Sequence, residues 1–210
     1  MAGLVLALTG AMIMTGCDTS DAAPTGDALY ADAEQTYLQY REFLGGMQST
    51  LSTGPWEGGQ IGGYGMQPAR CDGGAGYQFE LMRSLRQEGT DPADSADVVE
   101  QYLRDADMAP ARRTLGDGSK TLIQVAVRDQ GGFEQILVQF GRGGTVRLSA
   151  TTACRPGDAQ ALSDMLFGDV VLLGDYLPWV SESPTDPLFF GITPGDPQFP
   201  GGTPSPTPTP

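Results

Sequence analysis

The apolar residues follow a helical period in the first part of the chain, from about residue 27 to residue 52. Apolar side chains recur there at alternating steps of three and four, which places them on one side of an α-helix. They are Tyr30, Ala33, Tyr37, Tyr40, Leu44, Met47 and Leu51. We predict a helix with Asp27 as its N-cap, packed on its own domain in preference to a tyrosine surface that stacks on a ligand.

Further along the chain, apolar and polar residues alternate as they do in strands with one buried face. The predicted strands are 77–81, 112–115, 123–127, 136–140 and 146–150, and the predicted helices are 93–106 and 158–167. Glycine-rich turns join the last three strands, so these strands form a meander. The pattern predicts an α+β fold of two layers, an antiparallel β-meander sheet with one face covered by helices.

Polar residues of the meander gather on the face opposite the apolar one, and this face is expected to meet water or a partner. Gln124, Gln139 and Arg147 lie on it. Trp56 and Tyr64 belong to a glycine-rich stretch that has neither the glycine order nor the lysine of a phosphate-binding loop. We therefore expect a possible binding surface formed by these five residues.

The amino-terminal residues 1–16 carry no charged side chain, and the apolar run from Leu4 to Met14 has the length of a signal-peptide core. A bilayer span needs about 20 apolar residues. The run ends in Met-Thr-Gly before Cys17, the pattern of a bacterial lipobox, in which the cysteine thiol accepts a diacylglyceryl group. We predict a lipoprotein signal peptide at 1–16, a lipid anchor at Cys17 and a polar tether over 17–26. This places the protein on the extracytoplasmic face of the cell membrane.

Cysteine usage agrees with an exported protein. Beyond Cys17 the chain has an even pair, Cys71 and Cys154, and exported proteins fold in an oxidising setting. Alternate residues of a strand point to the same face. In steps of two, Cys71 is reached back from Tyr77 and Cys154 is reached onward from Val146, so both thiols face the core if the strands continue that far. We predict one disulfide between them, because a catalytic cysteine would have no histidine to activate it.

The predicted single domain covers residues 27–182. Prolines and glycines dominate from Ser183 onward, and the chain closes on alternating proline and threonine or serine. This composition favours polyproline II or disorder, so 183–210 is assigned to a disordered tail. A proline-motif ligand and an O-glycosylated stalk are the alternative interpretations of this segment.

Composition and charge exclude several classes of function. The chain has no histidine, which rules out Ser-His-Asp triads, Cys-His dyads and imidazole-ligated metals. Its 26 acidic and 12 basic side chains give a net charge of −14, which argues against nucleic acid as a partner. The acidic residues between positions 91 and 100 fit helix capping better than a calcium loop. We expect neither a metal nor a cofactor.

No constellation of residues indicates a reaction, and no Gly-x-Ser-x-Gly motif presents a serine nucleophile. We therefore expect a protein that is not an enzyme and that binds an envelope protein or a cell-wall component. Two alternatives stay open. One is a carrier of an apolar ligand held between the tyrosine-rich helix and the sheet, and the other is a cell-wall hydrolase that uses aspartate or glutamate.

The order of these features resembles the LppA-like lipoproteins of actinobacteria, a family of cell-envelope proteins of unknown function. The resemblance rests on the lipobox, the long helix, Trp56, Cys71, the strand with Tyr77 and Phe79, and Cys154. The absence of asparagine and the single lysine also suggest a GC-rich genome. The resemblance implies a lipid-anchored envelope location and one structural disulfide, and it transfers no catalytic residue.

The lipobox leads to the first testable prediction. Replacement of Cys17 by alanine removes the thiol that is acylated, so the variant should incorporate no labelled palmitate. Labelling of cells that produce either chain measures this directly. Ser20→Ala, a change just after the lipobox, serves as the control and should label like the unaltered chain. Labelling of the Cys17→Ala variant would show that the lipid is attached elsewhere.

Overall fold

The computed structural model describes residues 22–59, 64–118, 121–168 and 180–191. Within these residues the chain forms three helices and eight strands. The helices are α1 (Gly26–Leu51), α2 (Pro92–Asp105) and α3 (Ala159–Phe167). The strands are β1 (Trp56–Gly59), β2 (Pro68–Arg70), β3 (Tyr77–Arg86), β4 (Ala111–Leu115), β5 (Leu122–Gln130), β6 (Phe133–Gly141), β7 (Thr145–Thr152) and β8 (Val180–Glu182). The predicted signal peptide, Cys17 and the tail beyond residue 191 lie outside the described residues.

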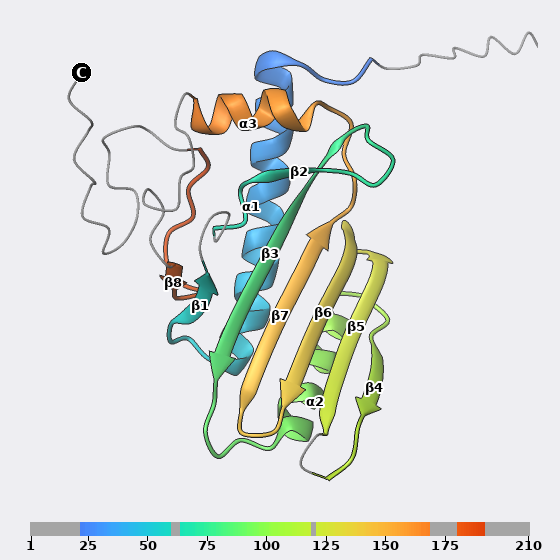
Figure 1. Ribbon diagram of the computed structural model, residues 1–210, viewed down its shortest axis with the longest axis vertical. Coiled ribbons are helices and arrows are strands. Elements are labelled where there is room, and N and C mark those ends of the chain that lie inside the picture. Colours follow the sequence, from blue (N-terminus) through green and yellow to red (C-terminus); the bar gives the residue numbers. More distant parts are fainter. Residues whose placement is uncertain (1–21, 60–63, 119–120, 169–179, 192–210) are drawn as a thin grey trace, which may run out of the picture.

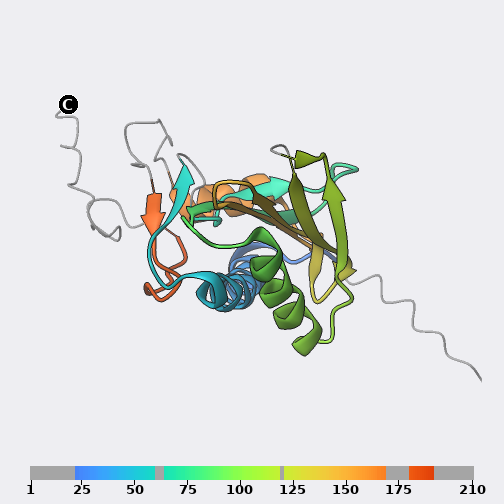
Figure 2. The same cartoon turned by 90° about the horizontal axis from the view of Figure 1, so that it is seen from below.

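The strands form one antiparallel sheet in the order β4-β5-β6-β7-β3-β1-β8, and β2 pairs with β3 beside this path. Figure 1 looks onto the sheet, with α1 and α2 behind it. Figure 2 shows the same two helices together on one side of the sheet. The predicted α+β class is therefore confirmed, with an open face opposite the helices.

The core lies between α1, α2 and the inner face of the sheet. α1 buries the predicted stripe through Ala33, Tyr37, Tyr40, Leu44 and Met47. The helix begins one residue before the predicted N-cap, because Thr25 occupies the cap position and Asp27 falls in the first turn. A carboxylate in that turn interacts favourably with the helix dipole.

The β5–β6 hairpin explains why the meander was visible in the sequence. Gln130 pairs with Phe133, so the turn consists of Gly131 and Gly132 alone. Both have positive φ angles, 61° and 81°, as a tight two-residue turn requires. The turn fixes the register in which the inward residues of β5 and β6 face the helices.

The strands β1, β2 and β8 were not predicted. They are short, and β1 and β2 lie on either side of the glycine-rich stretch that obscured their pattern. β1 joins β3 to β8 through the pairs Glu57–Ser84 and Trp56–Glu182. The sheet thus extends beyond the meander to β8, at the end of the predicted domain.

The disulfide between Cys71 and Cys154 is confirmed, with an S–S distance of 2.10 Å and a Cα–Cα distance of 5.8 Å. The strand positions from which we predicted it were wrong. Cys71 does not continue β3 but follows β2, and the chain reverses between Cys71 and Tyr77 so that β2 pairs with β3. The disulfide therefore joins the end of β2 to the segment after β7.

The domain extends past its predicted boundary at residue 182. Residues 183–191 follow β8 and pack on α1. The Tyr30 hydroxyl donates to the carbonyl of Phe190 at 3.3 Å, and the rings of Tyr37 and Phe190 lie 5.1 Å apart. This part of the predicted tail is a segment of the folded domain. Among the described helices, none has the length and apolar character of a membrane span.

The disulfide leads to a prediction about stability. The bond closes a loop across 83 residues, and its loss releases that constraint on the unfolded chain. The double variant Cys71→Ser, Cys154→Ser should lose about 2–5 kcal/mol in its free energy of unfolding. Urea denaturation with and without a thiol reductant measures this loss. The reductant should weaken the unaltered protein and leave the variant unchanged, and equal stabilities of the two oxidised chains would contradict the prediction.

Candidate functional site

Two polar regions of the described chain are candidate sites: a buried ion cluster beside α1 and the open face of the sheet. The cluster consists of Arg41 from α1, Arg83 from β3 and Glu182 from β8. Arg41 Nη2 donates to Glu182 Oε1 at 2.5 Å. Arg83 Nε donates to the same oxygen at 2.9 Å, and its Nη2 lies 2.7 Å away without the orientation of a hydrogen bond. One carboxylate thus holds two guanidinium groups.

The positions of the two arginines follow from the elements that carry them. Arg83 lies on the inward side of β3, in step with Phe79 and Leu81, and it is 0% exposed. Arg41 lies on the buried side of α1, one turn after Tyr37, and is 6% exposed. A buried charge is costly unless it is paired, so both arginines depend on Glu182.

Tyrosines and main-chain oxygens complete the surroundings of Arg41. Its Nη1 donates to the Tyr37 hydroxyl at 3.1 Å and to the carbonyl of Tyr64. The Tyr40 hydroxyl donates to the carbonyl of Gly65. These contacts attach the segment after the glycine-rich stretch to α1.

Burial and charge set the ionisation of these groups. Burial by itself would lower the pKa of Arg41, but the neighbouring Tyr37 and Glu182 outweigh it, so this pKa is raised. Burial lowers the pKa of Arg83, and Glu182 offsets part of that effect. Burial raises the pKa of Tyr64 to about 12 and raises the pKa of Tyr40 further. Arginine keeps its proton in proteins, so the cluster has two positive charges and one negative charge at neutral pH.

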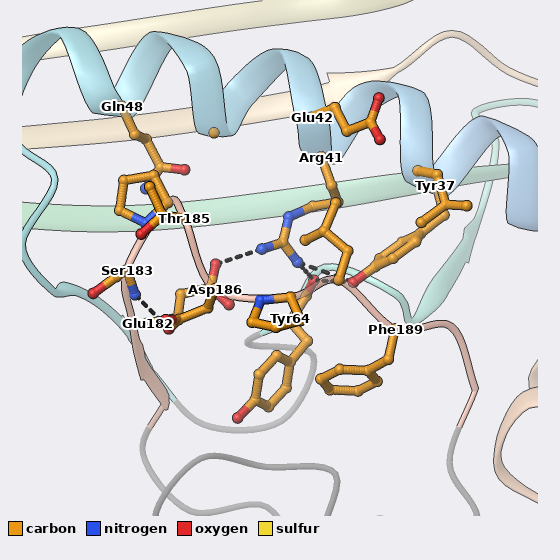
Figure 3. A pocket seen from close by; sticks show the side chains of 15 residues that line it. Tyr37, Arg41, Glu42, Gln48, Tyr64, Glu182, Ser183, Thr185, Asp186 and Phe189 are labelled. Atoms are coloured by element: carbon orange, nitrogen blue, oxygen red, sulfur yellow. Dashed lines mark hydrogen bonds and ion pairs between the residues drawn. The ribbon is translucent and has the colours of Figure 1, made fainter.

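A pocket of about 440 Å³ opens beside this cluster, between α1 and the segment 183–189 (Figure 3). Two buried donors at its wall, Arg41 Nε and Gln48 Nε2, have no hydrogen-bond partner among the described residues. Gly45 lies between them on the helix, and a Cβ there would stand 3.1 Å from the Pro184 carbonyl oxygen. Each of these donors can serve an acceptor atom, such as a water oxygen.

Acidic side chains also line this pocket. Glu42 comes from α1, and Asp186 accepts a hydrogen bond from the Ser183 N–H at 2.8 Å. With Glu182 they more than balance the positive charge of Arg41 at the wall. The pocket therefore does not select an anion by charge.

The open face of the sheet carries the second group of polar side chains. Strand pairing aligns its outward residues in rows that run across the strands. One row is Arg113, Gln124, Gln139, Arg147 and Ser84. The next row is Ala111, Ala126, Leu137, Ser149 and Met82, and the row after it is Arg128, Gln135, Thr151 and Glu80. An apolar row thus lies between two polar rows.

The charges on this face differ from those of the whole chain. Four arginines point outward from the strands, at positions 86, 113, 128 and 147, against two glutamates, Glu57 and Glu80. Arg113, Arg128 and Arg147 are exposed and form no ion pair with a described residue. The open face is therefore basic on a protein with a net charge of −14.

The small side chains of the apolar row leave a hollow of about 400 Å³ over β4, β5 and β6. Ala111, Ala126 and Leu137 line this hollow together with Arg113 and Arg128. Glutamine amides complete its lining, from Gln124, Gln130 and Gln135. The hollow combines apolar contact, amide hydrogen bonding and two positive charges in one place.

The predicted site residues separate into two groups in the structure. Gln124, Gln139 and Arg147 lie in one row of the open face, as neighbours on successive strands. Trp56 does not lie on a surface: it is 1% exposed, and its indole N–H donates to the Ser52 carbonyl at 3.2 Å. Tyr64 is also buried and lies beside the Arg41 cluster.

Some residues of both regions were missed from the sequence. Arg113 lies on the predicted strand 112–115 but was not assigned to the binding surface. The side chain of its neighbour Arg112 turns instead to Asp97 and Glu100 of α2. Arg83 had a detectable signal, because it continues the apolar alternation of its strand. Glu182 had none, since its partners lie 141 and 99 residues earlier in the chain.

No family model, curated protein or solved structure matches the chain. The fold defines its class as an α+β domain with a half-covered antiparallel sheet. Among the described residues, no group of three or more histidine, cysteine, aspartate or glutamate side chains is placed to hold a metal ion.

The buried ion cluster leads to a prediction about stability. Glu182→Gln removes the carboxylate charge that both arginines share and leaves two like charges buried together. We expect this variant to lose about 3–5 kcal/mol in its free energy of unfolding, measured by urea denaturation. The matched control is Glu57→Gln on β1, because Glu57 is exposed, and its effect should stay within about 0.5 kcal/mol. Similar losses in the two variants would contradict the assigned role of Glu182.

Proposed function

We propose that this protein is a lipid-anchored, non-catalytic binding protein of the bacterial cell envelope. Cys17 holds it on the extracytoplasmic face of the membrane, and the open face of its sheet contacts another envelope component. The lipobox supports the anchor, and the Cys71–Cys154 disulfide agrees with an exported protein. The resemblance to LppA-like lipoproteins points to the same location.

The observation that carries the proposal is the open face itself. Helices α1 and α2 cover the other face of the sheet (Figure 1). The open face presents three aligned rows of exposed and half-exposed side chains. Unpaired arginines and glutamines flank an apolar row with Leu137 and Met82, and Met82 is 57% exposed. An apolar strip with a polar margin rich in arginine is the arrangement found at protein contact surfaces.

The anchor and the open face have compatible positions. Ala22, the first described residue, lies five residues after Cys17, so at full extension it stays within about 18 Å of the lipidated cysteine. α1 has 26 residues and a length of about 39 Å, and the long strands run beside it (Figure 1). The open face therefore extends away from the anchored end and is free to contact a neighbour in the envelope.

The two alternatives have weaker support. An apolar ligand would need a cavity between α1 and the sheet, but that space is filled by core side chains such as Tyr37, Tyr40 and Phe79. A hydrolase would need a free carboxylate in a pocket. In the pocket beside α1, Glu182 is engaged by Arg41 and Arg83, and Asp186 accepts from the Ser183 N–H, so that only the exposed Glu42 among the described lining carboxylates has no such contact.

Site-specific photocrosslinking in cells tests the proposal. A benzophenone side chain at Gln139 or Ser149 should join the full chain to a discrete envelope component, because both positions lie on the open face. The control places the same group at Gln101, an exposed residue of α2 on the other side of the molecule. Crosslinks from Gln101 alone, or from none of the three positions, would reject the open face as the contact surface.

A further inference from the structure

The arginines of the open face are spaced around its apolar row. Arg113 and Arg147 belong to one row and lie three strand spacings apart, about 14 Å between Cα atoms. Arg128 lies on the other side of the apolar row, four residues along β5 from Gln124, the partner of Arg113. This separation is about 13 Å along the strands. A ligand that reaches all three must have several separated negative groups.

The apolar row shows what else the ligand must contain. Between Arg113 and Arg128 the surface is formed by Ala126 and Leu137, whose small and branched side chains leave the hollow described above. An apolar side chain would fill this hollow and lose its contact with water. The glutamines beside the hollow can both donate to and accept from peptide groups.

These features favour a polypeptide over a glycan. Aromatic rings provide the flat faces on which other rings stack, and no outward position of β3 to β7 among the described residues carries one. Arginine and methionine are enriched at protein interfaces. Guanidinium groups also pair with carboxylates through two parallel hydrogen bonds.

We propose that the open face binds an extended, acidic segment of a partner protein. In an extended chain, side chains on one face repeat about every 6.8 Å, so residues i and i+4 are about 13.6 Å apart. Two carboxylates at i and i+4 match Arg113 and Arg128, and an apolar residue at i+2 enters the hollow over Ala126. The expected recognition sequence is acidic-x-apolar-x-acidic. This inference rests on the proposed function and names the chemistry of the partner.

Fluorescence anisotropy with short labelled peptides tests this inference on the full lipidated chain in nonionic detergent. A peptide with Glu-Ser-Leu-Ser-Glu should bind at least about tenfold more tightly than one with Gln-Ser-Leu-Ser-Gln, which has lost the charges. It should also bind more tightly, by a similar factor, than Glu-Ser-Ser-Ser-Glu, which has lost the apolar residue. Equal binding of the three peptides would overturn the inference.

Two double variants assign the binding to the face. Arg113→Gln with Arg128→Gln should weaken binding of the acidic peptide at least about tenfold, because this double variant removes both charges opposite the peptide carboxylates. Arg70→Gln with Arg142→Gln makes the same change in net charge at exposed positions outside the three rows of the open face, and it should leave the affinity unchanged. Equal losses in both variants would show binding by overall charge and would overturn the proposed site.

Three further outcomes test the nature of the partner and separate this inference from the proposed function. Polygalacturonate that binds through Arg113 and Arg128, while the peptides do not, would identify a polyanionic glycan and overturn the choice of a protein partner. Crosslinks from Gln139 or Ser149 without peptide binding would leave the contact surface in place and refute only the acidic segment. Peptide binding without crosslinks would count against the proposed function instead.

Discussion

The fold depends most on the buried cluster of Arg41, Arg83 and Glu182. These residues come from the long helix, the interior strand β3 and the last described strand, and their charges can lie in the interior only when all three are together. An arginine in an apolar core destabilises any arrangement that leaves it unpaired. The cluster therefore ties the C-terminal segment to the rest of the domain more selectively than apolar contacts would.

The sequence was sufficient for the elements whose pattern is local. The α1 stripe and the meander were predicted because their periods are regular over many residues and tight glycine turns mark their ends. Short strands such as β1 and β8 were missed, because three or four residues show no period. The segment after Glu182 was assigned to the tail because its prolines hid Phe189 and Phe190, which pack on α1.

The residues of the candidate site also divide into those that a local sequence pattern predicts and those that it does not. Strand parity was enough to put Gln124, Gln139 and Arg147 on the outer face. It did not show that Arg113 and Arg128 surround a hollow, since this depends on which strands pair and in which register. Trp56 was assigned to the binding surface because it adjoins the glycine-rich loop, whereas the pairing of β1 with β3 and β8 draws it into the core.

The end of the molecule nearest the predicted anchor has a mechanical consequence. A pulling force on the tether would act on the first turns of α1. There Asp32 accepts a hydrogen bond from the Tyr77 hydroxyl at 2.6 Å and pairs with Arg155. Tyr77 begins β3, and Arg155 follows Cys154 of the disulfide. Force would thus pass from the helix to the start of β3 and to the segment after β7, which the disulfide joins to the end of β2. The domain is therefore reinforced at the end on which the predicted membrane anchor would exert force.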